Sequence, residues 1–139
     1  MVSTSSARLM ESQIDLSLAP NSEAVSAARH SLDELEGLLP PEKLEDVQLV
    51  VSELVTNSVR HAGLSPNDQI LLTVEISGRS VRGRVCDPGL GFEKPSEPRP
   101  RTDFSGGWGL PIVETISERW GVERNGSEGG LVCVWFEIG

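Results

Sequence analysis

The longest amphipathic stretch of the chain, from Glu42 to Ala62, constrains the fold more than any other feature. Val47, Val50 and Leu54 recur along it at helical spacing and define one apolar face. Gly63 follows directly, and glycine is the residue that most often closes a helix. The spacing therefore predicts one long helix with a single buried face.

The segments on either side of this helix supply the other elements of the fold. Period-two alternation predicts strands at residues 12–19, 70–76, 81–85, 121–125 and 131–138. Helical spacing predicts a helix over 25–35 and a short one carrying Leu110, Ile112, Val113, Ile116 and Trp120. This order predicts an α+β fold, a two-layer sandwich in which about three helices cover one face of a mostly antiparallel mixed sheet.

The length and the charge of the chain narrow its organisation and its partners. A chain of 139 residues fits one domain spanning 1–139. Its formal net charge of −9 repels nucleic acid and anionic membranes, so we expect neither as a partner. No apolar run approaches the roughly 20 residues of a membrane-spanning helix, and the polar start, residues 1–7, lacks a signal-peptide layout. We therefore expect a cytoplasmic protein.

Two cysteines, Cys86 and Cys133, lie far apart in the sequence, each within an apolar run predicted to be a strand. For a cytoplasmic chain this placement favours reduced core thiols over a disulfide, a metal site or a nucleophile.

Polar residues occupy an edge of the apolar face of the long helix. Glu53, Asn57 and His61 follow one another at intervals of four residues beside that face, not on the solvent side. A carboxylate and an amide aimed partly into a protein need a partner or a ligand. Two interpretations stay open: a boundary row that bonds to neighbouring backbone, or part of a ligand site.

A second inward-facing carboxylate ends a predicted strand. Alternation places Asp87 on the same face as Val81 and Val85, and Pro88-Gly89-Leu90-Gly91-Phe92 follows it. Proline followed by glycine favours a tight turn, and the second glycine removes a side chain where a ligand can approach the backbone. The segment predicts either a turn capped by an aspartate or a binding loop.

A glycine-rich loop, Gly106-Gly107-Trp108-Gly109-Leu110, opens directly into the last predicted helix. Exposed amides at a helix N-terminus form a cradle for phosphate, although a plain hinge has the same composition. The preceding segment, approximately 93–107, is rich in proline and charge and predicts a surface loop or lid.

The order of these three features resembles the superfamily of gyrase, histidine-kinase and related ATPases (GHKL), whose nucleotide site is called the Bergerat fold. In so short a chain, the motifs look most like those of the bacterial anti-sigma-factor serine/threonine kinases. The resemblance extends from the first strand to Phe136. It rests on the segments Val51–Ser58 (Glu-x-x-x-Asn), Asp87–Phe92 (Asp-x-Gly-x-Gly) and Gly106–Leu110.

This resemblance implies a role for each polar residue. Asn57 is the expected Mg²⁺ ligand, bridging the metal to the triphosphate of ATP. Glu53 is the expected general base, which takes a proton from the hydroxyl that attacks the γ-phosphate. Asp87 is expected to accept a hydrogen bond from the exocyclic amine of adenine.

The resemblance also implies that backbone segments surround the nucleotide. Gly89 and Gly91 are expected beside the base and ribose. The loop residues expected at the phosphates, under the lid, are Gly107, Trp108, Gly109 and Leu110. Arg99 and Arg101 lie in the lid, where solvent exposure is the simpler interpretation. The last strand departs from the family, because Leu131–Val134 lacks the threonine usually found near the nucleotide.

The function implied is that of an ATP-dependent protein kinase. By this resemblance we expect the chain to phosphorylate a serine of a small anti-anti-sigma partner of the STAS type, to sequester a sigma factor and to form a homodimer. Arg29 falls where such proteins often contact a partner, although a surface salt bridge is the alternative. Because the threonine is missing, a second hypothesis is a module of the same fold that holds nucleotide and partner without phosphorylating anything.

Overall fold

A five-stranded sheet forms one layer of the computed structural model, which describes residues 11–61, 63–89, 110–125 and 130–139. The order across the sheet is β1-β2-β3-β5-β4, and each neighbouring pair is antiparallel. The strands are β1 (Glu11–Leu18), β2 (Ile70–Ser77), β3 (Ser80–Asp87), β4 (Arg119–Asn125) and β5 (Leu131–Ile138). Gly78, with a φ of +62°, lies in the turn between β2 and β3.

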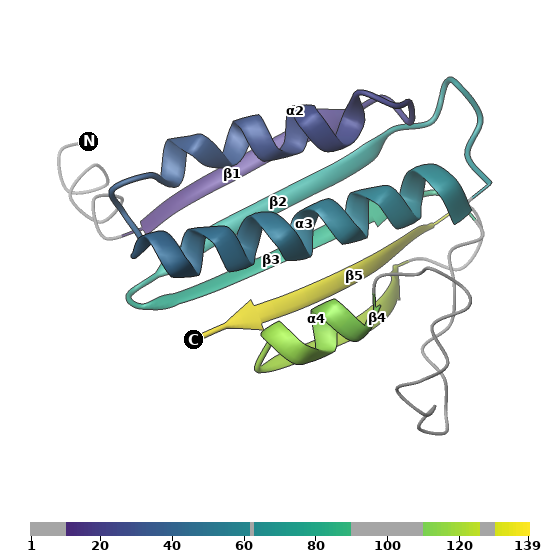
Figure 1. Ribbon diagram of the computed structural model, residues 1–139. Coiled ribbons are helices and arrows are strands. Elements are labelled where there is room, and N and C mark those ends of the chain that lie inside the picture. The colour runs from purple at the N-terminus through teal and green to yellow at the C-terminus, as the bar shows by residue number, and fades with distance from the viewer. Residues whose placement is uncertain (1–10, 62, 90–109, 126–129) are drawn as a thin grey trace, which may run out of the picture.

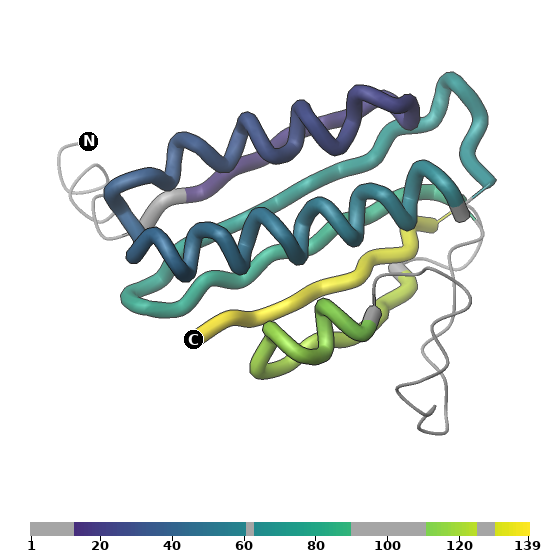
Figure 2. The backbone as a smooth tube through the Cα atoms, in the orientation of Figure 1, coloured from purple at the N-terminus to yellow at the C-terminus, as the bar shows by residue number. Residues whose placement is uncertain are grey.

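The helices of the described residues all lie on one face of this sheet (Figures 1 and 2). They are α2 (Ala24–Ser31), the 3-10 helix η1 (Leu32–Leu35), α3 (Pro41–His61) and α4 (Leu110–Ile116). The predicted α+β sandwich is therefore confirmed. The helix predicted over 25–35 continues past Ser31 as the tighter η1.

The core lies between α3 and the helix-facing side of the sheet. Val47 and Val50 of α3 are fully buried, and Phe136 of β5 is buried from the sheet side. The Phe136 ring covers Gly83 of β3 so closely that a Cβ there would stand 2.5 Å from Cζ of the ring. Gly83 therefore makes room for the largest fully buried side chain, which anchors α3 over β3 and β5.

The short last helix ends earlier than the sequence predicts. The predicted helix included Trp120, but α4 ends at Ile116 and Trp120 belongs to β4. The amide of Ser117 still bonds to the Val113 carbonyl at 2.9 Å, whereas the amide of Glu118 donates to the Glu137 carbonyl of β5 at 2.8 Å. The chain joins the sheet at Glu118, so the helical spacing of Trp120 was misleading.

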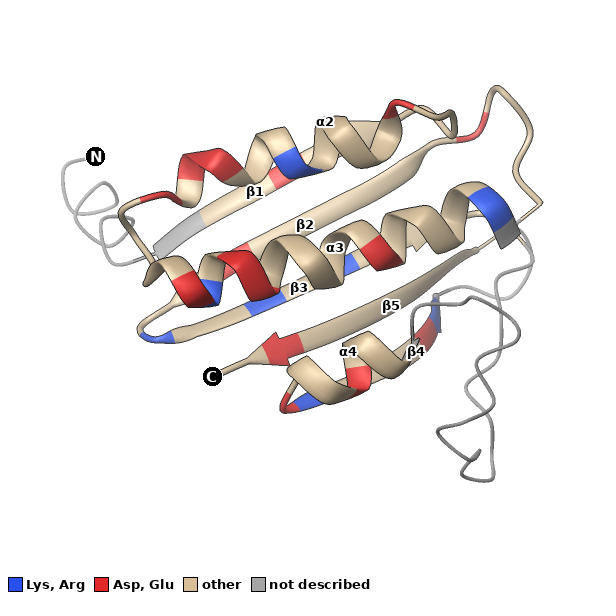
Figure 3. Ribbon diagram, viewed as in Figure 1, with Lys and Arg blue, Asp and Glu red and all other residues tan. Residues whose placement is uncertain are grey.

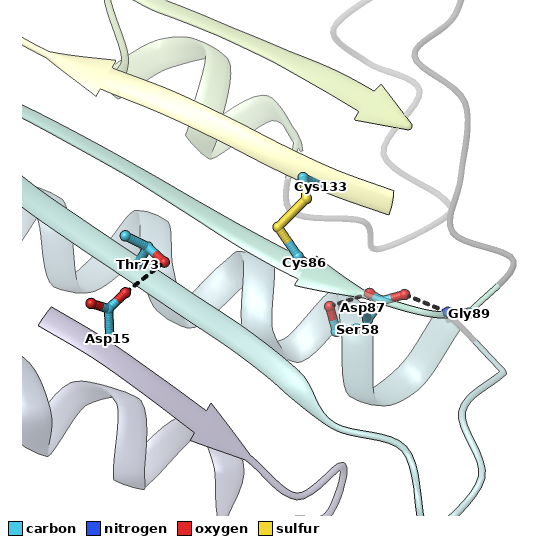
Figure 4. The surroundings of a disulfide bond; sticks show 7 residues. All are labelled: Asp15, Ser58, Thr73, Cys86, Asp87, Gly89 and Cys133. Carbon is cyan, nitrogen blue, oxygen red and sulfur yellow. Dashed lines mark hydrogen bonds between the residues drawn. A yellow bond between two sulfur atoms is a disulfide. The ribbon is translucent and has the colours of Figure 1, made fainter. Parts of the chain in front are cut away.

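Cys86 and Cys133 form a disulfide, so the prediction of reduced thiols is wrong. The two residues lie directly opposite each other in the β3–β5 register, with Cα atoms 4.0 Å apart. The bond lies on the sheet face away from the helices (Figure 4). Antiparallel pairing joins positions 47 residues apart, and this register is not visible in the local sequence pattern.

Loss of this disulfide is expected to destabilise the fold. A link between distant residues restricts the unfolded chain, so reducing it should lower the free energy of unfolding by roughly 2–4 kcal/mol. Thermal unfolding followed by circular dichroism, with and without a thiol reductant, measures the change. A Cys86→Ala/Cys133→Ala variant should not respond to the reductant. Equal midpoints for the wild type in both conditions would contradict the expectation.

The open face of the sheet, away from the helices, carries paired charges. Glu137 of β5 accepts hydrogen bonds from Arg119 of β4 and Arg82 of β3. The hydrogen bond from Arg119, followed by that from Arg82, lowers the pKa of Glu137.

Acidic residues are distributed over both layers (Figure 3). Among the described residues, no helix combines the length and apolar character needed to cross a bilayer.

Candidate functional site

The end of α3 meets the end of β3 at a buried carboxylate. Asp87 is the last residue of β3 and only 6% exposed. Its Oδ2 accepts a hydrogen bond from Ser58 Oγ of α3 at 2.7 Å, and its Oδ1 accepts one from the Gly89 amide at 2.9 Å (Figure 4). These bonds join helix, strand and the following turn, so Asp87 has a fixed orientation.

Asn57 precedes Ser58 on α3 and is 3% exposed. Neither its side-chain oxygen nor its side-chain nitrogen has a hydrogen-bond partner among the described residues. A buried polar group without a partner costs about 1–3 kcal/mol, so such a group is informative where it occurs. The most direct reason to keep an amide in this state is a ligand that bonds to it.

Glu53 lies one helical turn before Asn57 on the same edge of α3. It is half-buried, and its carboxylate makes no hydrogen bond or ion pair with any described residue. Neither Glu53 nor Asn57 therefore makes a side-chain hydrogen bond to the described neighbouring backbone. The third member, His61, ends α3, and its side chain lies outside the described part of the structure.

The residues of this row fit a magnesium ion bound with a nucleotide. Mg²⁺ prefers oxygen ligands and keeps several waters, so it is held by one or two protein groups and the phosphates of a substrate. A buried amide oxygen with no protein partner suits that role. Within the described ranges, no group of three or more His, Cys, Asp or Glu residues is placed to hold a metal by itself.

The remaining predicted contacts lie at the end of β3 and before α4. Gly89 is described and bonds to Asp87, whereas Leu110 is described only as the first residue of α4. The other predicted site residues, Gly91, Gly107, Trp108 and Gly109, lie outside the described residues, as do the lid at 93–107 and its Arg99 and Arg101.

Comparison with known protein families identifies the type of domain. A family described as the histidine kinase-like ATPase domain matches residues 18–136. The chain belongs to this family. The matched region spans all three segments on which the sequence resemblance rests.

The chain is similar over most of its length to two anti-sigma F factors and to a serine-protein kinase. An anti-sigma F factor from Clostridium acetobutylicum is 29% identical over 135 residues, covering 91% of this chain and 94% of the relative. One from Shouchella clausii is 31% identical, covering 78% of this chain and 81% of the relative. The serine-protein kinase RsbW of Listeria innocua is 30% identical, covering 78% of each.

A solved structure shares the fold. It contains the RsbU and RsbW domains of a Mycobacterium tuberculosis protein, and it superposes with a TM-score of 0.67 at 19% identity. The match covers 91% of this chain and 31% of that longer chain. At this identity the likeness concerns the fold alone.

Ser58 is a residue of the candidate site that the sequence pattern did not single out. Its helical position put it with Val50 and Leu54 on the apolar face, and the structure places it there, 6% exposed. A hydroxyl among aliphatic side chains needs a partner. The sequence also predicts that Asp87 points inward, from the strand that faces the long helix. A hydrogen bond between Ser58 and Asp87 could therefore have been predicted from the sequence.

The segment of the last strand that lacks a threonine lies directly beside Asp87. Val132 of β5 is its partner in the β3–β5 register and is 6% exposed. An aliphatic side chain therefore stands across from the carboxylate, within Leu131–Val134, which contains no threonine. It provides no hydroxyl to a ligand.

A hollow of about 360 Å³ lies on the opposite side of the sheet. Thr73, Glu75, Arg84 and Trp135 are among its lining residues, and they belong to the open face. Asp87 points the other way, toward α3, through its bond to Ser58. This hollow and the candidate site are therefore distinct.

Proposed function

We propose that this chain binds Mg-ATP where the end of α3 meets the end of β3. We further propose that it is an anti-sigma-factor serine/threonine kinase, which phosphorylates a small anti-anti-sigma partner of the STAS type and sequesters a sigma factor. The observation that carries the proposal is the buried, unpartnered amide of Asn57, which directly precedes the serine that bonds to the carboxylate of Asp87. Family membership and the names of the relatives support it.

Each polar residue has one task in this proposal. The Asn57 amide oxygen holds Mg²⁺, which when bound neutralises negative charge on the phosphates. Glu53, one turn away, takes the proton of the partner's serine hydroxyl as its oxygen bonds to the γ-phosphorus and the bond to ADP breaks. Asp87, an acceptor-only group, receives a hydrogen bond from the adenine amine.

Backbone segments complete the proposed site. The resemblance assigns Gly89 and Gly91 to the base and ribose, the residues Gly107, Trp108, Gly109 and Leu110 to the phosphates, and the segment at 93–107 to a lid over them. Apart from Gly89 and the backbone of Leu110, these residues lie outside the described part of the chain.

The names of the relatives support a sigma factor as a partner of this chain, whereas the anti-anti-sigma partner is proposed from the resemblance. Arg29 of α2 is exposed and forms no ion pair with a described residue, which leaves its charge available for an acidic partner surface. We propose that the protein works as a homodimer, as the resemblance implies, and that it is cytoplasmic, as the sequence pattern led us to expect.

The nucleotide assignment is tested by replacing Asp87 with asparagine. Hydrogen bonds to charged groups contribute about 1.5–3 kcal/mol, so ATP affinity should fall roughly 10- to 100-fold. Isothermal titration calorimetry measures the dissociation constant. Asp46→Asn, at an exposed position on α3, is the matched control and should bind like the wild type. Unchanged affinity for Asp87→Asn would refute the adenine contact.

A second candidate function is a module that binds nucleotide and partner without transferring phosphate. The last strand favours it, because Leu131–Val134 lacks the threonine that the resemblance leads us to expect, and the aliphatic Val132 of that segment stands opposite Asp87. The two candidates share the ATP site and differ only in the chemistry at Glu53.

A further inference from the structure

We propose that Ser58 is a positioning residue that makes the site selective for adenine. It orients the carboxylate of Asp87 so that the remaining lone pairs face the amine of the base. This inference rests on the proposed function, because it assumes that ATP occupies the site, and it adds a residue and a specificity to it.

The hydrogen bond between Ser58 and Asp87 has little competition from water. Both residues are 6% exposed, and the bond is 2.7 Å long. A buried hydrogen bond to a charged group is among the stronger ones in a protein, since the low local dielectric strengthens it. The carboxylate therefore keeps the orientation that Ser58 gives it.

Two donors from different elements restrain the two oxygens of Asp87 separately. Ser58 of α3 holds Oδ2, while the Gly89 amide, in the turn after β3, holds Oδ1 (Figure 4). With both oxygens bonded, the carboxylate cannot rotate about its Cβ–Cγ bond without losing one of them. Each oxygen has two lone-pair directions, so one on each stays available for a ligand.

A fixed carboxylate distinguishes adenine from guanine by charge and by hydrogen-bonding type. Adenine carries an amine, a donor, on the ring carbon where guanine carries a carbonyl oxygen, an acceptor. A carboxylate held in one orientation bonds to the first and repels the second. Without Ser58, only the Gly89 amide restrains Asp87, and the group can turn or recruit water, which weakens this discrimination.

Ser58 also links the two ends of the proposed site. It follows Asn57 directly on α3, so the residue that orients the base acceptor and the residue proposed to hold the metal share one helical turn. The spacing between base and metal is then set by the backbone of α3, which the core packing of Val51, Leu54 and Val55 keeps in place.

The test compares three nucleotides in two serine variants. Calorimetry with Mg²⁺ gives dissociation constants of wild type, Ser58→Ala and Ser52→Ala for ATP, GTP and purine riboside triphosphate, which lacks the amine. Ser52 is a matched control, because it is a buried serine on α3 whose Oγ donates to the Gln48 carbonyl at 2.6 Å, not to Asp87.

The expected result is selective. Ser58→Ala should weaken ATP binding roughly tenfold and narrow the ATP/GTP ratio, because one bond to a charged group is lost. Its affinity for purine riboside triphosphate should change less than about twofold, and Ser52→Ala should leave all three constants unchanged. Should Ser58→Ala not fold, Ser58→Cys, which keeps the size with a weaker donor, should show the same selective loss.

Two results would overturn the inference. One is an equal loss for ATP and for purine riboside triphosphate, which would make Ser58 a structural residue only. The other is an unchanged ATP/GTP ratio in Ser58→Ala while Asp87→Asn weakens ATP, which would overturn the role of Ser58 and leave the proposed function standing. A wild type that binds no ATP would overturn both together.

Discussion

Replacing Glu53 with glutamine is expected to slow phosphoryl transfer severely while ATP still binds. Glutamine keeps the size of the side chain but cannot accept the serine proton, and general-base catalysis contributes typically 10²- to 10⁴-fold to a rate. The rate of phosphoryl transfer from labelled ATP to a cognate partner should therefore fall at least about 100-fold. Glu53 is half-buried and bonded to no described residue, so the variant should fold normally.

This experiment also separates the two candidate functions. Glu45→Gln, at an exposed position of the same helix, is the control and should transfer phosphate at the wild-type rate. A Glu53→Gln variant with full activity would contradict the assignment of the base. A wild type that binds ATP and its partners but phosphorylates none of them would contradict the kinase, and the binding module would then account for the chain.

Replacing Asn57 with alanine is expected to weaken Mg-ATP binding without lowering the stability of the fold. The buried amide has no partner among the described residues, so its removal takes away a group whose burial costs about 1–3 kcal/mol. Thermal stability without nucleotide should stay the same or rise. Mg²⁺ raises the ATP affinity of the wild type, and in the variant this increase should be smaller by a factor of at least roughly 10 to 100. Replacing a residue that only hydrogen-bonds to a metal ligand already costs this much metal affinity.

Asn21 provides a control variant for which the opposite result is expected. The side-chain oxygen of Asn21 accepts a hydrogen bond from the Glu23 amide at 2.8 Å before α2. Asn21→Ala should therefore lower stability by about 0.5–1.5 kcal/mol and leave Mg-ATP binding unchanged. Calorimetry with and without Mg²⁺, together with thermal unfolding, measures both quantities. Loss of stability in Asn57→Ala with binding intact would show that Asn57 is a structural residue.

Much of the fold can be predicted from periodicity, because each element carries its own pattern. The apolar face of α3 and the alternation in β2 and β3 reappear as buried positions. The exceptions have non-local causes. Trp120 joins the sheet because the Glu118 amide finds a carbonyl in β5. The Cys86–Cys133 bond depends on the β3–β5 register, which local spacing does not specify.

The candidate site is predictable to the extent that its residues violate those patterns. Asn57 and Asp87 stand out as polar groups on faces where aliphatic residues belong, and both are buried in the structure. Ser58 does not stand out, because a serine is small enough to be tolerated on an apolar helix face. Its significance appears only when the facing carboxylate is placed within hydrogen-bonding distance, and that placement depends on how α3 packs over β3.

The most direct test of a single Mg-ATP site is a crystal structure of the chain with Mg²⁺ and a non-hydrolysable ATP analogue. We expect the metal on the amide oxygen of Asn57, the adenine amine on Asp87, and Glu53 beside the γ-phosphate. An analogue in the hollow lined by Arg84 and Trp135 on the open face, or a metal remote from Asn57, would contradict this account.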